Sequence, residues 1–195
     1  MFDPAGPVLG IDPGVSRCGY GAVTSAPGAR LTARACGVIR TDPQLPLPAR
    51  LVELEAELDR LVAEHAPSAV VVERVLFQAN VRMAMSVGQA SGLALLVAAR
   101  AGVPVVQYSP NEVKLAVTGD GAADKLQVQA MVTRLLALAH TPRPADAADA
   151  LALALCHLSG ARFEAALPGS YGDAPVSSSR FERAVAAAIA REERS

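Results

Sequence analysis

The sequence predicts one α/β domain with a mixed β-sheet, followed by a tail. Three observations predict this fold class. Short apolar strands come first, strands then alternate with helices, and the pattern is lost after about residue 160. Hydrophobic residues make up 51% of the 195 residues, which is enough to build a core. We therefore expect a domain over residues 1–160 and a linker with a tail or short helix over 161–195.

The strands are expected where short apolar runs lie between turn-forming residues. The first run ends at Asp12 and is followed by a Pro-Gly turn. A β-branched run without alternation ends at Glu73 and is typical of a strand buried on both faces. Strands are predicted at residues 7–12, 18–24, 31–40, 69–72 and 103–108. The first three, joined by tight links, suggest an antiparallel meander.

The helices are expected from apolar residues spaced three and four apart. Leu51, Leu54 and Leu58 follow this spacing, with Glu and Arg on the other face. Helices are predicted at residues 46–65, 80–101, 111–117, 122–138 and 144–158. Residues 167–180 are rich in Pro, Gly and Ser and predict a linker. Residues 181–194 are expected to form a short amphipathic helix or a tail.

The composition excludes several classes of protein. The formal net charge of -1 argues weakly against nucleic-acid binding, although it does not say where the charges lie. Three Cys without CxxC spacing indicate reduced thiols, and with no signal peptide in view we expect a cytoplasmic protein. The apolar stretch near Leu93 is cut short by Arg100, so no membrane span is expected.

Four carboxylates form a candidate metal site. Asp12 and Glu73 each end a buried strand, where ligand chemistry collects in α/β proteins. Asp146 and Asp149 are three residues apart in a predicted helix and therefore point from one face. Carboxylates that lie close together repel one another, and divalent cations neutralise them. Hard oxygen ligands select Mg²⁺ or Mn²⁺ over zinc.

Each carboxylate also has an ordinary structural explanation. Asp12 before Pro-Gly is a common turn former, Glu73 suits a solvated strand end, and Asp146 near a helix start favours the helix dipole. Asp149 is harder to explain this way, because it lies a turn deeper in an apolar helix, where an unpaired carboxylate is costly. The spacing alone does not show that the four residues meet.

Three sequence blocks carry a family resemblance. Residues 9–14 (LGIDPG) followed by residues 19–21 (GYG) form the first, residues 72–75 (VERV) with 88–92 (GQASG) the second, and residues 146–152 (DAADALA) the last. In order and interval, from Asp12 to about His157, they closely resemble the RuvC family of Holliday junction resolvases. The combination is specific, whereas any single block is not.

The resemblance implies a ribonuclease-H-like fold, with a sheet of three antiparallel and two parallel strands flanked by helices. It implies a crossover junction endodeoxyribonuclease of DNA recombination and repair. Such an enzyme is a homodimer whose two active sites nick two strands of like polarity at a four-way junction. It also implies a branch-migration partner, the RuvA–RuvB complex.

The resemblance also assigns residues. The family's metal ligands fall on Asp12, Glu73, Asp146 and Asp149. Its two basic residues fall on Lys114 and Lys125, the only lysines of the chain. We expect these lysines near phosphate, although solvated surface charges would look the same.

Contacts with DNA stay open at this stage. The family often carries a base-contacting Phe three residues after the glutamate, but here Leu76 stands there and Phe77 follows. Phe77 stacking on a base and Phe77 packing in a loop are equal alternatives. Arg74 and Arg82 are candidates for holding the DNA backbone, with solvated surface arginines as the alternative.

The expected mechanism is two-metal phosphodiester hydrolysis. Two Mg²⁺ ions, for which Mn²⁺ would substitute, would flank the scissile phosphate, with Asp12 bridging both. Lys114 and Lys125 would bind phosphate or stabilise the transition state.

Three other functions compete with this one. Phosphotransferases of the sugar-kinase, actin and heat-shock ATPase class also open with a strand, an Asp and a glycine turn. The chain is short for their two lobes and has no second glycine-rich motif. A ribonuclease-H-like nuclease acting on an RNA–DNA hybrid and a non-catalytic junction-binding module are the other two.

Overall fold

The computed structural model describes residues 6–25, 30–74 and 81–166. Its elements are β1 (Val8–Asp12), β2 (Arg17–Thr24), β3 (Thr32–Arg40), α1 (Leu47–His65), β4 (Ala69–Glu73), α2 (Val81–Arg100), β5 (Val105–Tyr108), α3 (Pro110–Thr118), α4 (Lys125–Leu135) and α5 (Ala145–Ala166). Contacts divide the chain into two units, Met1–Arg162 and Phe163–Ser195. The packing described below is that of the first unit. The linker and tail predicted after residue 166 lie outside the described residues.

The five strands form one mixed sheet in the order β3-β2-β1-β4-β5. The pairs β1–β2 and β2–β3 are antiparallel, while β1–β4 and β4–β5 are parallel. Helix α1 follows β3 and brings the chain back so that β4 lies beside β1. A parallel pair needs a crossover of this kind. The predicted sheet of three antiparallel and two parallel strands is confirmed.

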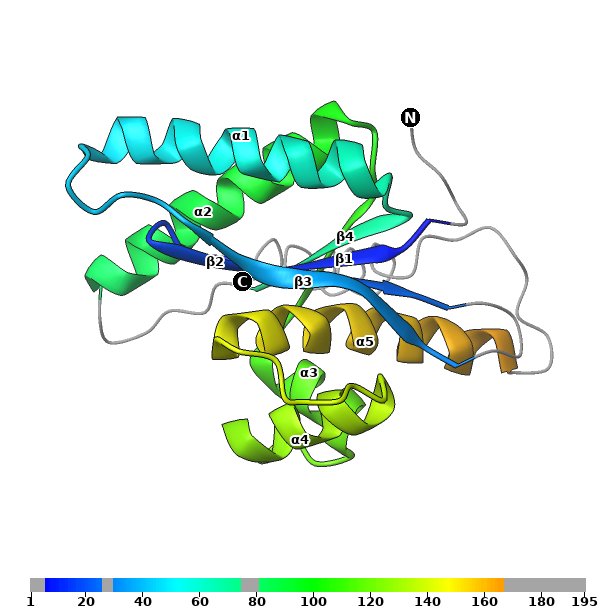
Figure 1. The fold of residues 1–195 in the computed structure, drawn as a ribbon. Helices are drawn as coiled ribbons and strands as arrows, with labels where there is room; N and C mark the ends of the chain where they lie inside the picture. The colour runs from blue at the N-terminus through cyan, green and yellow to red at the C-terminus, as the bar shows by residue number, and fades with distance from the viewer. Residues whose placement is uncertain (1–5, 26–29, 75–80, 167–195) are drawn as a thin grey trace, which may run out of the picture. The chain divides into compact units, whose positions relative to one another are not determined.

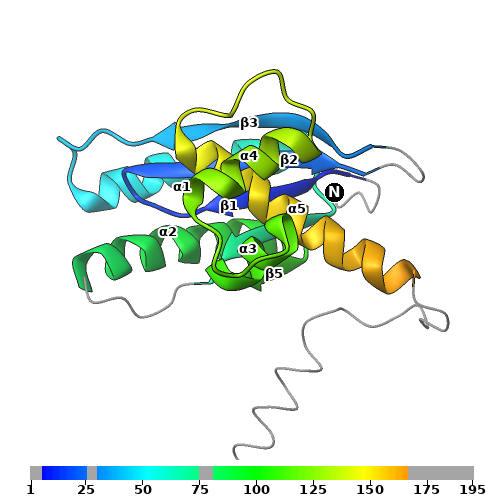
Figure 2. The same ribbon diagram turned by 90° about the horizontal axis from the view of Figure 1, so that it is seen from below.

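Helices cover both faces of the sheet. Figure 1 shows α1 and α2 on one face and α5 on the other, with α3 and α4 beyond α5. Figure 2 looks onto the second face and shows α5 lying across the strands. Each face of the sheet has its own hydrophobic core, and successive residues of a strand point into the two cores in turn. Leu9 and Ile11 pack in the α1–α2 core, while Val8 packs in the α5 core.

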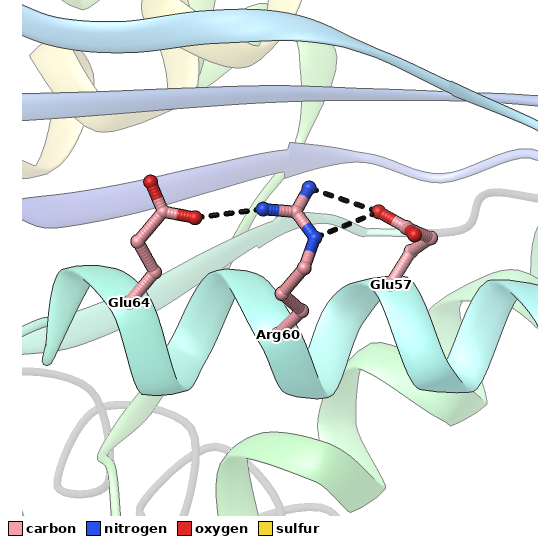
Figure 3. Close-up of polar contacts among 3 residues, drawn as sticks. All are labelled: Glu57, Arg60 and Glu64. Carbon is pink, nitrogen blue, oxygen red and sulfur yellow. Dashed lines mark hydrogen bonds and ion pairs between the residues drawn. The ribbon is translucent and has the colours of Figure 1, made fainter.

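Helix α1 is amphipathic, as its sequence spacing predicts. Leu54, Leu58 and Leu61 are buried against the sheet. On the solvent side, the Arg60 guanidinium lies 2.9 Å from Glu57 and 2.7 Å from Glu64 (Figure 3). These pairs lie one turn apart on the helix surface, where such contacts add little stability.

The bounds of two helices differ by more than one residue from the predicted ones. Helix α4 begins at Lys125 rather than residue 122, because the Asp124 side chain accepts a hydrogen bond from the Gln127 amide and caps the helix there. It ends at Leu135, three residues before the predicted end. Helix α5 continues past the predicted end at Leu158 to Ala166, since no Gly-Pro signal stops it.

The expectation that Arg100 interrupts the apolar stretch was wrong. Arg100 is the last residue of the stretch Met83–Arg100, which is long and apolar enough to cross a membrane by length and composition alone. One side of this helix packs on the sheet, where Ala90, Ala94 and Val97 are buried. Its apolar character is therefore partly that of a core helix.

Candidate active site

Two of the four predicted carboxylates stand at neighbouring strand ends. Strands β1 and β4 run parallel with Ile11 beside Val72, so Asp12 and Glu73 follow at adjacent positions. Since Ile11 and Val72 both enter the α1–α2 core, alternation turns the next residue of each strand toward α5. The sequence therefore places both carboxylates on one face and at one edge of the sheet.

Glycines on β1 and β2 allow α5 to lie directly on that face. A Cβ atom on Gly10 would lie 2.0 Å from the Ala150 carbonyl oxygen, and one on Gly19 would lie 2.1 Å from that of Asp146. Both separations are far below contact distance, so only glycine fits. This close approach brings the N-terminal turns of α5, with Asp146 and Asp149, beside Asp12.

The carboxylates face a cleft of about 340 Å³ between the sheet and the helices. Its charged lining consists of Asp12, Glu73, Asp149, Lys114 and Lys125, and its apolar lining includes Val113, Val128 and Leu153. Five of the six residues predicted to be catalytic thus share one cavity. Asp146 is not among the lining residues, although its charge acts on Asp12.

The electrostatics of the cleft disfavour negative charge. Burial, together with the charges of Asp149, Glu73 and Asp146, raises the pKa of Asp12 from 3.8 to about 7, and the charge of Lys125 opposes this rise. Burial and the Asp149 charge raise the pKa of Glu73 in the same way. Both carboxylates would therefore be stabilised by added positive charge.

Two cations already engage the carboxylates of α5. Lys125 Nζ lies 2.7 Å from Asp149 Oδ2, and this hydrogen bond is the main reason that the pKa of Lys125 is raised. The Arg17 guanidinium, at the start of β2, pairs with Asp146 Oδ2. Sequence reasoning missed Arg17, because nothing in its spacing relates it to a residue on a helix 129 positions away.

With these pairs in place, no three Asp, Glu, His or Cys side chains within 6–25, 30–74 and 81–166 stand close enough to hold a metal ion. The carboxylates of α5 point to their cations rather than to a shared centre. A metal ion bound by these carboxylates would therefore compete with the positive charges of Lys125 and Arg17.

The remaining predicted DNA contacts fare differently. The exposed Arg74 guanidinium donates a hydrogen bond to the Gln107 carbonyl oxygen at 3.0 Å, next to the strand end that carries Glu73. Phe77 and the side chain of Arg82 lie outside the described residues. His157 Nδ1 lies 3.1 Å from the Tyr108 hydroxyl.

Comparison with known proteins places the chain in a family. Residues 8–157 match the family model described as "Crossover junction endodeoxyribonuclease RuvC". This chain belongs to the RuvC family. The predicted resemblance and enzyme class are thereby confirmed, and the match spans all four carboxylates and both lysines.

Individual RuvC proteins agree with this assignment. A crossover junction endodeoxyribonuclease RuvC of Salinispora arenicola is 61% identical over 151 residues, which are 77% of this chain and 86% of the relative. The structure of Thermus thermophilus RuvC in complex with a Holliday junction substrate is 39% identical with a TM-score of 0.76, over 81% of this chain and 96% of that one. The yeast mitochondrial Holliday junction resolvase Ydc2, at 14% identity and a TM-score of 0.57, shares the fold.

Proposed function

We propose that this chain resolves four-way DNA junctions by metal-dependent hydrolysis of phosphodiester bonds. The observation that carries the proposal is the convergence of Asp12, Glu73 and Asp149 on one cleft that also holds both lysines of the chain. The relative from Thermus thermophilus has been solved in complex with a Holliday junction substrate, which supports the choice of substrate.

The donor set fits a hard divalent cation. All four candidate ligands are carboxylates, and at least two have raised pKa values that a bound cation would reverse. We assign Asp12, Glu73, Asp146 and Asp149 as the residues that would hold Mg²⁺, two ions per site, with Mn²⁺ as a substitute. The metal supplies a bound water of lowered pKa and neutralises charge on the phosphate.

The lysines provide fixed positive charge for the substrate. Lys114 lines the cleft from α3, and Lys125 lines it as the first residue of α4. An ammonium group there attracts the scissile phosphate and stabilises the charge that grows on it during hydrolysis. Arg74 is a candidate for a neighbouring backbone phosphate, as are Arg82 and, for base stacking, Phe77.

We further propose that the active form is a homodimer joined through α2. The outer side of this helix exposes Met85 and Leu96, at 60% and 42%, and nothing lies within 4 Å of a Cβ placed on Gly88 or Gly92. Small residues four apart on an apolar face let a second helix approach closely. Two active sites in one particle would account for paired nicks at a junction.

The dimer is tested by placing a charge on this face. Gly92→Glu should give a monomer in analytical ultracentrifugation and should convert paired nicks into single ones. Val52→Glu, at an exposed apolar position of α1, is the control and should leave the dimer intact. A Gly92→Glu variant that stays dimeric would exclude α2 as the contact.

The cellular setting is also a proposal. The thiols of Cys18, Cys36 and Cys156 are free, which agrees with a cytoplasmic protein. A partnership with the RuvA–RuvB branch-migration complex follows from the family resemblance, and a pull-down with purified RuvA–RuvB on a synthetic junction tests it.

Cleavage of a synthetic mobile junction tests the central proposal. The wild-type chain should cut the junction with Mg²⁺ or Mn²⁺ and not with EDTA. Asp149→Asn should still bind the junction, because it removes negative charge and no basic group, but should lose cleavage. Asp59→Asn is the matched control. Asp59 is an exposed carboxylate of α1 that does not line the cleft, so this variant should cut normally.

Two outcomes would contradict the proposal. Wild-type protein that binds the junction tightly but never cuts it with either metal would indicate a binding module. Protein that cuts an RNA–DNA hybrid and leaves the junction intact would indicate a different nuclease of the same fold.

A further inference from the structure

Arg17 stands out among the basic residues because it is bonded to a candidate metal ligand from another part of the fold. It is the first residue of β2, and its guanidinium pairs with Asp146 in the first turn of α5. The Arg17 side chain is 45% exposed and that of Asp146 is 26% exposed. The pair therefore lies at the protein surface rather than in the core.

The loop that presents Arg17 is held by a separate set of contacts. Thr41, which is buried, donates to the Val15 carbonyl oxygen at 2.7 Å. Arg50 of α1 donates to Thr41 Oγ1 at 2.9 Å and to Ser16 Oγ at 2.5 Å. These hydrogen bonds hold the segment between Asp12 and Arg17 in place, and this segment positions the Arg17 guanidinium beside Asp146.

The backbone of this loop is also tightly folded. A Cβ on Gly14 would lie 2.4 Å from the Arg17 carbonyl oxygen, so glycine is required for the chain to turn back at this distance. Alternation along β2 then puts Arg17 on the same face as Gly19, the residue on which the Asp146 backbone rests. The same local packing therefore positions both members of the ion pair.

The ion pair has a consequence for metal binding. Arg17 already pairs with Asp146 Oδ2, so a divalent cation that binds this carboxylate competes with the guanidinium for its negative charge, and no ready-made three-ligand set stands in the described part of the chain. Arginine keeps its charge in proteins, so this competition does not vanish through loss of a proton.

We propose that Arg17 is a positioning residue of the nuclease site, which holds Asp146 while no divalent cation is bound and competes with that cation for the carboxylate. This inference rests on the proposed metal-dependent function. Arg17 would keep its positive charge beside Asp146 when a cation binds, and this charge would also favour the DNA backbone.

The competition is modest in size. An exposed ion pair of this kind contributes little, because water screens it and both side chains lose freedom. Removing such a pair is expected to change an equilibrium constant by a factor of about two to five. A doubly charged ion therefore overcomes the competition from Arg17, but at a cost in affinity that can be measured.

The test is a titration of the full-length protein with Mn²⁺ in the absence of DNA, with free Mn²⁺ followed by electron paramagnetic resonance. Arg17→Gln should bind Mn²⁺ about two- to five-fold more tightly than wild type. Arg17→Lys keeps the charge and should stay within about two-fold of wild type. Arg40→Gln is the matched control, since Arg40 faces Arg17 across β2–β3 and makes no ion pair among the described residues. It should change Mn²⁺ affinity less than Arg17→Gln does.

Cleavage kinetics give a second readout. Arg17→Gln should reach half-maximal cleavage at a lower Mn²⁺ concentration. At saturating Mn²⁺ its KM for the junction should rise while kcat stays closer to wild type, because the lost charge contacts substrate rather than the reacting atoms. Arg17→Lys should restore the wild-type KM.

A measurement on wild-type protein covers the case in which Arg17→Gln does not fold. The Nε–H signal of Arg17, assigned by its loss in Arg17→Lys, should shift in a ¹⁵N spectrum when Mg²⁺ is added. An unchanged signal at saturating Mg²⁺ overturns the inference, as does Mn²⁺ affinity in Arg17→Gln that equals or falls below that of wild type. If wild type neither binds Mn²⁺ nor cuts the junction, the proposed function itself fails.

Discussion

Replacing Asp12 by Asn is expected to stabilise the metal-free protein at pH 8 while abolishing cleavage. In the folded chain the pKa of Asp12 is raised from 3.8 to about 7 by burial and by the other carboxylates. Between these two pH values the folded state binds more protons than the unfolded state, so stability falls as pH rises. The penalty is absent below about pH 4 and complete above about pH 7.

The shift sets the size of the effect. The difference between 7 and 3.8, at about 1.36 kcal/mol per unit, gives an upper limit of about 4 kcal/mol. Because the cleft is open to water, which screens the charges, we expect on the order of 2 kcal/mol. Asn has nearly the same shape and no charge, so it escapes this penalty at every pH.

Urea denaturation in EDTA between pH 4.5 and pH 8.5 measures the effect. Asp12→Asn should be more stable than wild type at pH 8, and the difference should shrink toward pH 4.5. The stability of Asp12→Asn should still fall somewhat as pH rises, because the pKa of Glu73 is also raised. The exposed Asp59→Asn is the control and should follow wild type. An Asp12→Asn variant with the same pH slope as wild type would refute the reasoning.

Four further outcomes are expected. Gly10→Ala should destabilise the protein by about 3 kcal/mol or prevent folding, because its Cβ would meet the Ala150 carbonyl oxygen at 2.0 Å. Gly160 lies in helix α5 with open space around it. Gly160→Ala should instead raise the free energy of unfolding, measured with urea, by about 0.5–1 kcal/mol. Lys125→Gln should lower the metal-free melting temperature at pH 8, since its charge offsets that of Asp149; a rise would contradict this. Junction affinity of the wild type should fall steeply with salt if basic side chains hold the DNA backbone, and a flat salt profile would exclude such contacts.

Local patterns in the sequence predicted the helices and strands, and they predicted which elements carry the candidate site residues. The β-branched run that ends at Glu73 predicts a doubly buried strand, and the leucine spacing of α1 predicts its buried face. Both follow from the fixed periods of strand and helix, which need no tertiary information. The helix ends were less certain, because Asp124 caps α4 through one side-chain bond that competes with the apolar pattern.

The sequence by itself determined that carboxylates end two buried strands and that two more share a helix face, since strand alternation and helix period are local properties of the chain. Only the tertiary structure decided that three of them, Asp12, Glu73 and Asp149, line one cleft. This depends on glycines of β1 and β2 that pack against the backbone of α5, a contact between segments more than a hundred residues apart. The Arg17–Asp146 pair was invisible in the sequence for the same reason: packing of whole elements, rather than spacing along the chain, sets which charges become neighbours.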